Sequence, residues 1–268
     1  MAYWVAILPR SKKSIAALLQ TLSQRFDRKF LSDDPVFFVH PYSDPRDQEV
    51  VGLISALLAF GNVKTIHQSI QKVLEVMGSS PADFIANFDF KRQGASLNRL
   101  GHRWVRSGDI RLLFVVLKKI LRRHASLKSF FLEGYNDGDL DVSGVLHCFS
   151  KGALSLAGSS DLSRGFRYFF PSPINGSPCK RLNLFLRWMV RPADGIDLGL
   201  WTEIPPSKLV IPLDTHIYQF GTRFGLSRTK TANWRFARDL TDFLKTIDPV
   251  DPVRFDFPIC HYGMEEGW

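Results

Sequence analysis

The segment that ends at Asp214 places an acidic side chain directly before a predicted helix. The apolar residues Ile211, Pro212 and Leu213 lead to Asp214, and an amphipathic stretch follows over residues 215–224. Aspartate is a favourable N-cap residue, and the helix dipole stabilises its negative charge. If Asp214 also faces a cleft, it is a partly buried carboxylate available for catalysis. Asp214 is therefore a candidate both for helix capping and for chemistry.

Lys180 lies in the first turn of a second predicted helix, whose other residues are mostly apolar. The preceding residues predict Ser177 as the N-cap and Pro178 as the first helical residue. A cation is disfavoured at the N-terminus of a helix. The position therefore favours the neutral amine that a lysine nucleophile requires. The alternative is an exposed lysine with its ammonium group in water.

Alternating acidic residues give a superficial match to a calcium loop. Asp137, Asp139 and Asp141 have the spacing of the first, third and fifth positions. The sixth position is Val142 instead of glycine, and the twelfth is Cys148 instead of glutamate. The pattern indicates a solvated acidic turn.

No other grouping predicts a metal or a cofactor. Asp214 and His216 are two residues apart, so their side chains diverge on a helix, and no further ligand cluster accompanies them. The three cysteines of the chain are one short of an all-cysteine zinc or iron–sulfur site. Cys260 and His261 are adjacent, and adjacent side chains rarely face each other, so Cys260 is expected to be a buried structural residue.

Helical periodicity dominates the chain and predicts an all-α fold. Apolar residues recur three and four apart over residues 12–26, 48–60, 111–124, 180–191 and 234–247. Residues 209–213 could form a short strand, although Pro212 argues against a central one. The 268 residues are long for one domain and short for two independent ones. We therefore expect one domain with two helical lobes around a central cleft.

Positive charge is concentrated in one segment. The chain carries a net charge of +9, and residues 91–131 hold eleven lysines and arginines against one acid, Asp109. The polar face of the helix expected there consists of Lys118, Lys119, Arg122 and Arg123. Such a patch is typical of a protein that binds a polyanion, and the alternative is a solvated helix face.

The N-terminal segment does not predict membrane insertion or export. The apolar run over residues 2–8 is too short to span a bilayer, and its positive charges follow it, whereas a signal peptide carries them in front. We therefore expect a cytoplasmic, monomeric protein that makes no contact with a membrane.

Three segments together resemble helix-hairpin-helix DNA glycosylases of the endonuclease III type. Residues 212–226 (PLDTHIYQFGTRFGL) resemble the signature that contains the catalytic aspartate, which by this match is Asp214. Asp44 and Pro45, followed by residues 49–62 (EVVGLISALLAFGN), resemble the early helix of the superfamily. Residues 254–263 resemble its closing helix. The resemblance covers roughly residues 40–265.

The chain departs from endonuclease III in two features. The usual L-P-G-V-G-x-K hairpin is absent, and the nearest match is Lys180, 34 residues before Asp214 and after a Gly176-Ser177-Pro178 turn. This separation is similar to that of archaeal 8-oxoguanine DNA glycosylases. The C-terminal four-cysteine iron–sulfur loop is also absent. The chain therefore resembles a little-characterised bacterial branch of the superfamily.

The resemblance implies two lobes and a base-excision function. Residues 51–200 would form the middle lobe with the hairpin, and residues 1–50 with 201–268 would form the second. The cleft would receive a damaged base, such as 8-oxoguanine, flipped out of double-stranded DNA in the nucleoid. Residues 175–180, including Ser177, would contact the DNA backbone, as would the basic helix face.

The resemblance also assigns roles to individual residues. Lys180 would attack C1′ of the damaged nucleoside, and Asp214 would stabilise the positive charge that develops on the sugar. The resulting imine would permit strand cleavage by β-elimination. Asn62 is a candidate for hydrogen bonding to the base, and Trp188 is a candidate for stacking on it, although a tryptophan at that spacing is also typical of a core.

Two other classes of function remain open. A non-catalytic DNA-binding or repair-accessory protein of the same fold would tolerate changes at Lys180. A metal-dependent nuclease that uses Asp214 and His216 would lose its activity in chelator.

Overall fold

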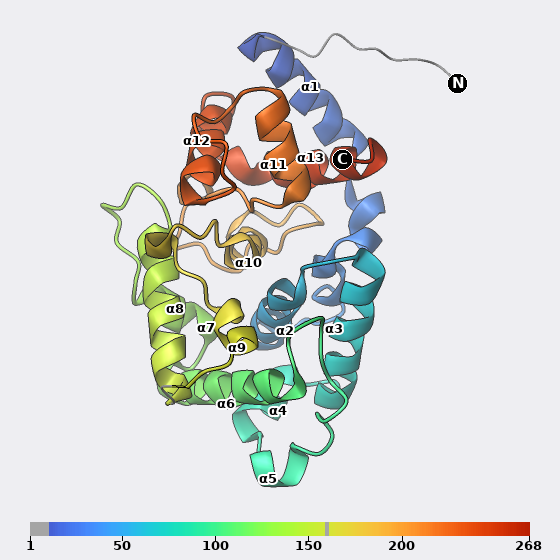
Figure 1. Ribbon diagram of the computed structural model, residues 1–268, viewed down its shortest axis with the longest axis vertical. Helices are drawn as coiled ribbons and strands as arrows, with labels where there is room; N and C mark the ends of the chain where they lie inside the picture. Colours follow the sequence, from blue (N-terminus) through green and yellow to red (C-terminus); the bar gives the residue numbers. More distant parts are fainter. Residues whose placement is uncertain (1–10, 159–160) are drawn as a thin grey trace.

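The computed structural model of the chain describes residues 11–158 and 161–268 (Figure 1). These residues form α-helices and short 3-10 helices joined by loops, and no strand occurs among them. The all-α expectation is therefore confirmed. Residues 209–213 form neither a helix nor a strand. The apolar run over residues 2–8 lies outside the described part of the chain.

The α-helices include the five that the periodicity predicts, which begin and end close to the expected positions. Their N-caps include Asp44, Asn62, Asp214 and Asn233, and the side chain of each accepts a hydrogen bond from a backbone N–H group of the first turn. The α-helices are α1 Lys12–Arg25, α2 Pro45–Leu58, α3 Val63–Met77, α4 Pro81–Asn87, α5 Phe90–Gln93, α6 Ser107–His124, α7 Leu127–Leu132, α8 Ser143–Ala157, α9 Arg164–Phe169, α10 Lys180–Val190, α11 Thr215–Arg223, α12 Trp234–Lys245 and α13 Asp256–Glu265. The 3-10 helices are η1 Arg28–Asp33, η2 Pro35–Phe38, η3 Pro173–Asn175, η4 Pro206–Lys208 and η5 Pro252–Phe255.

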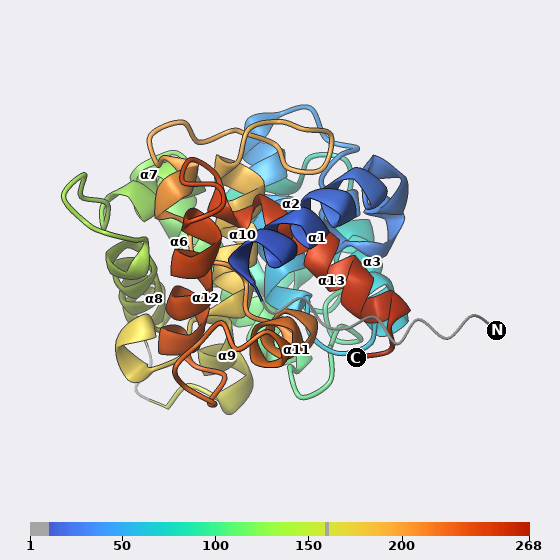
Figure 2. The ribbon, with the colours of Figure 1, turned by 90° about the horizontal axis from the view of Figure 1, so that it is seen from above.

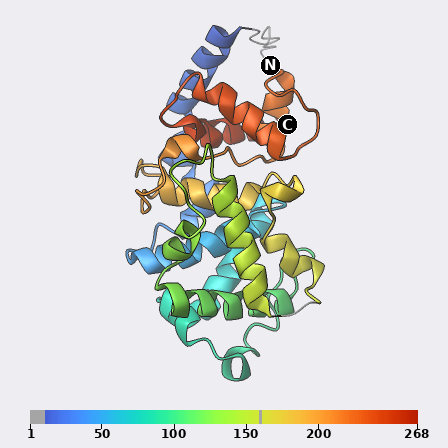
Figure 3. The same cartoon turned by 90° about the vertical axis from the view of Figure 1, so that its left-hand side faces the viewer.

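The helices gather into two groups at opposite ends of the molecule. Helix α1 lies with α11, α12 and α13 at one end, and α2 to α9 occupy the other (Figures 1 and 3). Seen from above, α1 crosses α13, against which it packs although the two helices lie at opposite ends of the sequence (Figure 2). We call these groups the upper lobe (α1, α11–α13) and the lower lobe (α2–α9).

Helix α10 lies between the two lobes and holds them together. It packs along α2, and every residue from Arg181 to Val190 is buried. One hydrophobic cluster runs through both lobes. The expected lobe boundary after residue 50 falls inside α2, which continues through it as one helix.

Two buried arginines, Arg187 on α10 and its C-cap residue Arg191, tie the C-terminal half of this helix to the surrounding loops. Arg187 pairs with Asp197 at 3.1 Å and with Asp256, and its guanidinium lies 3.9 Å from Asp34. Arg191 pairs with Asp197 as well, and also with Asp194 at 3.1 Å and Asp251 at 2.9 Å. Because an unpaired buried charge is costly, loss of either arginine should weaken this junction strongly.

Candidate functional site

A cavity of about 530 Å³ opens where α10 meets the upper lobe. Its walls come from the segment after α2, the N-terminal part of α10, the start of α11 and one face of α13. Lys180 and Asp214, which are 34 residues apart in the sequence, both line it. The volume lies in the range of small-molecule sites in proteins. The two residues singled out by sequence therefore belong to one cavity.

Asp214 is a partly buried carboxylate held from two directions. It is the N-cap of α11, and its Oδ1 accepts a hydrogen bond from the backbone N–H of Ile217 at 2.8 Å. Its Oδ2 accepts a hydrogen bond from the thiol of Cys260 at 3.3 Å. The dipole of α11 stabilises a negative charge at this point. Asp214 therefore presents a fixed carboxylate to the cavity.

The turn before α10 differs from the one that the sequence predicts. The N-cap is Cys179, in the left-handed conformation with φ of 48°, and the helix begins at Lys180. Ser177 is not the N-cap and Pro178 is not the first helical residue, because the left-handed Cys179 turns the chain after them. Gly176 is also left-handed, with φ of 77°, so two tight turns separate η3 from α10. Ser177 Oγ instead accepts the N–H of Cys179 at 3.2 Å.

Lys180 points across the cavity to the C-terminus of α2. Its Nζ donates a hydrogen bond to the carbonyl of Ala59, the C-cap residue of α2, at 2.9 Å. The last carbonyls of a helix have no partner within that helix and attract a cation. Lys180 is half-buried and is not the exposed lysine of the alternative interpretation. Helix α2 therefore positions the amine from outside α10.

A second carboxyl group, Asp256, lies in the same cavity. It is buried at the start of α13 and pairs with Arg187. Burial raises the pKa of the Asp256 carboxyl, Arg187 opposes the shift and nearby Asp214 adds to it, and the net pKa is about 7. The sequence did not predict Asp256 as a site residue, because only its position in residues 254–263, the closing-helix segment, pointed to it.

Cys260 is not poised as a nucleophile. Burial, followed by the nearby carboxylates of Asp214 and Asp256, raises the pKa of its thiol well above the ordinary value. The thiol lines the cavity and donates to Asp214. Cys260 is thus a partner of the candidate catalytic carboxylate, rather than the simple core residue that the sequence predicts.

The two candidate base-binding residues do not join this cavity. Asn62 is exposed, and its Oδ1 caps α3 by accepting the N–H of Lys64 at 3.0 Å. The neighbours of Asn62 in the chain, Gly61 and Val63, line the cavity instead. Trp188 is fully buried in the hydrophobic core and offers no surface to a base.

The basic face of α6 lies away from the cavity, and its two lysines bind the protein itself. The Nζ of Lys118 donates to the carbonyl of Phe88 at 2.5 Å, and the Nζ of Lys119 donates to the carbonyl of Leu156 at 2.7 Å. These carbonyls belong to the C-terminal ends of α4 and α8. Only Arg122 and Arg123 of this face are exposed. In Figure 1 α6 lies toward the end opposite α11.

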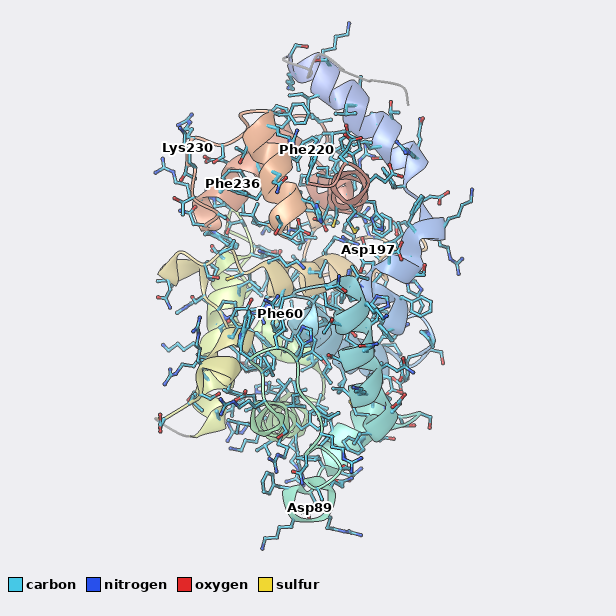
Figure 4. The ribbon with its side chains drawn as sticks, turned by 45° about the vertical axis from the view of Figure 1, so that its right-hand side comes forward. Phe60, Asp89, Asp197, Phe220, Lys230 and Phe236 are labelled. Carbon is cyan, nitrogen blue, oxygen red and sulfur yellow. The ribbon has the colours of Figure 1, made fainter. Side chains whose placement is uncertain are left out.

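An aromatic rim beside the cavity had no signature in the sequence. Phe60, Trp104 and Tyr168 pack with ring centroids 5.0 to 5.2 Å apart, and Trp104 is 42% exposed. Phe60 and Tyr168 line the cavity. Three segments supply these rings, so only the folded chain brings them together. Figure 4 shows Phe60 near the middle of the molecule.

Two arginines add positive charge to this rim. Arg103 stacks on Trp104 at 4.9 Å and lies so close to Gly61 that a Cβ there would be 3.0 Å from its Nη1. Arg181 stacks on Tyr168 at 3.6 Å and donates to the carbonyls of Leu57 and Tyr168. Among the described residues no carboxylate pairs with Arg181. Trp104 and Arg103 are exposed and can therefore accept aromatic rings and negative charge, whereas Arg181 is buried.

Metal chemistry finds no support in the side-chain arrangement. Within residues 11–158 and 161–268, no three histidine, cysteine or acidic residues are grouped so that they could hold a metal ion. In the same residues no helix is long and apolar enough to cross a bilayer.

Comparison with known proteins gives one match. A family model described as "Protein of unknown function (DUF2400)" matches residues 34–265. This range includes every residue that lines the cavity except Asp33. Neither the curated proteins nor the solved structures contain a match to the chain.

Proposed function

The chain belongs to the DUF2400 family, and we propose that it is a DNA glycosylase, with associated lyase activity, that excises a damaged base from double-stranded DNA. The observation that carries the proposal is the presence of Lys180 and Asp214 on one cavity of about 530 Å³. An amine and a carboxylate in one cleft are the groups that a glycosylase with an imine intermediate requires. The resemblance of residues 212–226 to the glycosylase signature supports the same assignment.

In the proposed reaction the damaged nucleotide leaves the duplex and its base enters the cavity. The amine of Lys180 attacks C1′, and the electron pair of the glycosidic bond departs with the base. The carboxylate of Asp214 stabilises the positive charge that develops on the sugar and assists transfer of the amine proton. The imine that forms after ring opening then allows β-elimination of the 3′ phosphate.

The geometry around both residues supports these roles. Lys180 is held toward the cavity by the Ala59 carbonyl, a hydrogen bond that its amine can give up when substrate arrives. Asp214 is fixed by a backbone N–H group and a thiol, so little reorganisation is needed as charge develops. The aromatic rim next to the cavity offers ring faces and arginine charge to the nucleotides beside the extruded one.

Trapping with borohydride tests the proposal. The protein is incubated with duplexes that each carry one lesion, 8-oxoguanine first among them, with and without borohydride. Wild type should release the base, nick the strand and form a trapped covalent adduct. Lys180→Gln should lose the adduct and the nick together. Lys119→Gln is the matched control, because it also removes a lysine hydrogen bond to a carbonyl but lies outside the cavity.

Each contrary result has a distinct meaning. Base release without any adduct identifies water as the nucleophile and a monofunctional enzyme. An adduct that persists in Lys180→Gln shows that another amine reacts. DNA binding without release of any base from the panel would favour an accessory protein, and activity that disappears in chelator would favour a nuclease.

A further inference from the structure

The carboxyl groups around α10 outnumber the arginines that they face. Arg187 and Arg191 pair with five aspartates, so two positive charges meet five carboxyl groups, an excess of three negative charges when all are ionised. Both arginines are buried, so solvent screens these charges only weakly. An excess of buried negative charge is relieved when a carboxyl group takes up a proton. The five aspartates are Asp34, Asp194, Asp197, Asp251 and Asp256.

Burial raises the pKa of Asp197, Asp251 and Asp256, and of these three only Asp256 lines the cavity. Its pKa is raised to about 7 by burial and by the neighbouring Asp214. Its Oδ2 accepts a hydrogen bond from Nη1 of Arg187, whereas no donor among the described residues reaches its Oδ1. Because Oδ1 has no donor and yet is not among the fully enclosed polar atoms that lack a partner, it is not fully enclosed. A proton on Asp256 therefore resides on Oδ1, the oxygen accessible from the cavity.

The surroundings of Asp256 contain both signs of charge. Arg187 favours its ionised form, and Asp214 and Asp34 favour its protonated form. On its own helix, one turn onward, Cys260 lines the same cavity. The other titratable groups that line the cavity are Asp33, Lys180, His216, Tyr168, Tyr218 and His261. The helices α1 and η5 that pack on α13 carry Arg25 and Arg254, which pair with Glu265 and Asp248.

We propose that Asp256 is the general acid of this site and protonates the departing base from the cavity side. This inference rests on the proposed glycosylase function and deepens it. Oδ1–H of Asp256 gives its proton to a ring nitrogen of the base while the C1′–N bond breaks and its electron pair moves to the base. The amine of Lys180 forms the new bond to C1′. Asp256 is left as a carboxylate beside Arg187, which stabilises it.

The different roles of the two carboxyl groups indicate a substrate class. Asp214, at the helix N-terminus, acts as an anion toward the sugar, whereas Asp256 acts as an acid toward the base. An acid is needed when the expelled base is a poor leaving group as an anion and carries a basic ring nitrogen. The site is therefore built for intact-ring purine lesions, which leave after protonation.

An abasic substrate separates protonation of the base by Asp256 from imine formation by Lys180. Asp256→Asn keeps the shape and an oxygen for Arg187 but supplies no acidic proton. On a purine-lesion duplex the variant should lose base release by roughly 100-fold or more. On an abasic duplex, which has no base to expel, it should still form the borohydride adduct within about twofold of wild type. The pH profile adds a second readout: the ratio of wild-type to variant release should fall as pH rises through about 7.

Two control variants separate proton donation by Asp256 from a structural role. Asp197→Asn also removes a carboxylate from Arg187 but does not line the cavity, so it should reproduce any purely structural loss without the selective effect. Asp256→Glu retains an acid and should restore part of the release. Equal loss of release and abasic trapping in folded Asp256→Asn, or unchanged release, overturns the role of Asp256. Wild type that neither releases a base nor traps an abasic strand overturns the proposed function itself.

Discussion

The thiol of Cys260 donates a hydrogen bond to Oδ2 of Asp214 across 3.3 Å and so joins α13 to the N-terminus of α11. The two helices pack closely, because Gly263 has no side chain: a Cβ there would lie 2.7 Å from the Cβ of His216. The backbone of α11 fixes Oδ1 of Asp214 and a side chain of α13 fixes Oδ2. The orientation of the candidate catalytic carboxylate therefore depends on the packing of two helices.

Removal of this thiol should weaken base release without abolishing it. Cys260→Ala leaves Oδ2 of Asp214 without its donor, and a hydrogen bond of this kind contributes about 1 kcal/mol, so release should slow by roughly three- to tenfold. Cys260→Ser restores a donor and should recover most of the rate in single-turnover assays. Cys148→Ala, a change at an exposed cysteine, is the control. Equal rates in all three variants would show that the thiol does not position Asp214.

Substitutions of Asp214 should separate capping from catalysis. Asp214→Asn retains an oxygen that caps α11, so its melting temperature should change little while base release is lost. Asp214→Ala should lose release and in addition about 1 kcal/mol of stability. Asn233→Ala removes the corresponding cap of α12 and should cost similar stability with activity retained. Full activity of Asp214→Asn, measured on the substrate that wild type processes, would exclude the proposed role.

The four residues of the basic face of α6 should divide into two pairs. Arg122 and Arg123 are exposed, so replacing both with glutamine should flatten the dependence of log affinity on log salt by about 0.9 per lost phosphate contact. Lys118 and Lys119 bind carbonyls at the ends of α4 and α8, so replacing both should lower the melting temperature instead. DNA-binding titrations at several salt concentrations test the first pair. An unchanged slope would assign Arg122 and Arg123 to a solvated helix face.

The aromatic rim should contribute to DNA affinity. Trp104 is partly exposed and stacks with Phe60 and Tyr168, so Trp104→Ala should weaken binding to a lesion duplex by about 1–3 kcal/mol, with little change in melting temperature. Phe90→Ala is a matched control, because Phe90 is an exposed ring under Arg111. It adjoins Asp89, which Figure 4 shows at the far end of the molecule. Equal effects of the two changes would remove the rim from the binding surface.

The buried carboxyl of Asp256 should also make stability depend on pH. Its pKa is about 7 in the folded chain against an ordinary value of 3.8, so the folded state binds the proton more tightly. The associated stability is fully present below about pH 4 and is lost as pH rises through about 7. Asp256→Asn has no such group, so its melting temperature relative to wild type should increase between pH 5 and pH 8, in buffers at about constant ionic strength. A difference that is constant with pH would contradict a raised pKa.

Several helices and the cap at Asp214 could be predicted, because each depends on residues that are close together in the sequence. Apolar spacing predicted the helices that became α1, α2, α6, α10 and α12, since a helix needs only a continuous apolar face to be stabilised by packing. Asp214 was predicted as a helix N-cap for the same reason, because capping involves groups three residues apart. The prediction of Ser177 as the N-cap of α10 and Pro178 as its first residue was wrong. The N-cap is Cys179, a non-glycine residue in the left-handed conformation that usually favours glycine.

The sequence by itself determined an all-α chain with a capping aspartate and a lysine at a helix start. Only the tertiary structure decided which groups share the cavity. Asp256 and Cys260 come from α13, and the rings of Phe60, Trp104 and Tyr168 come from three separate segments. Their proximity results from helix packing through the buried α10, which brings together residues far apart in the chain. The pKa of Asp256 likewise depends on burial and on charges contributed by other helices, neither of which the local sequence specifies.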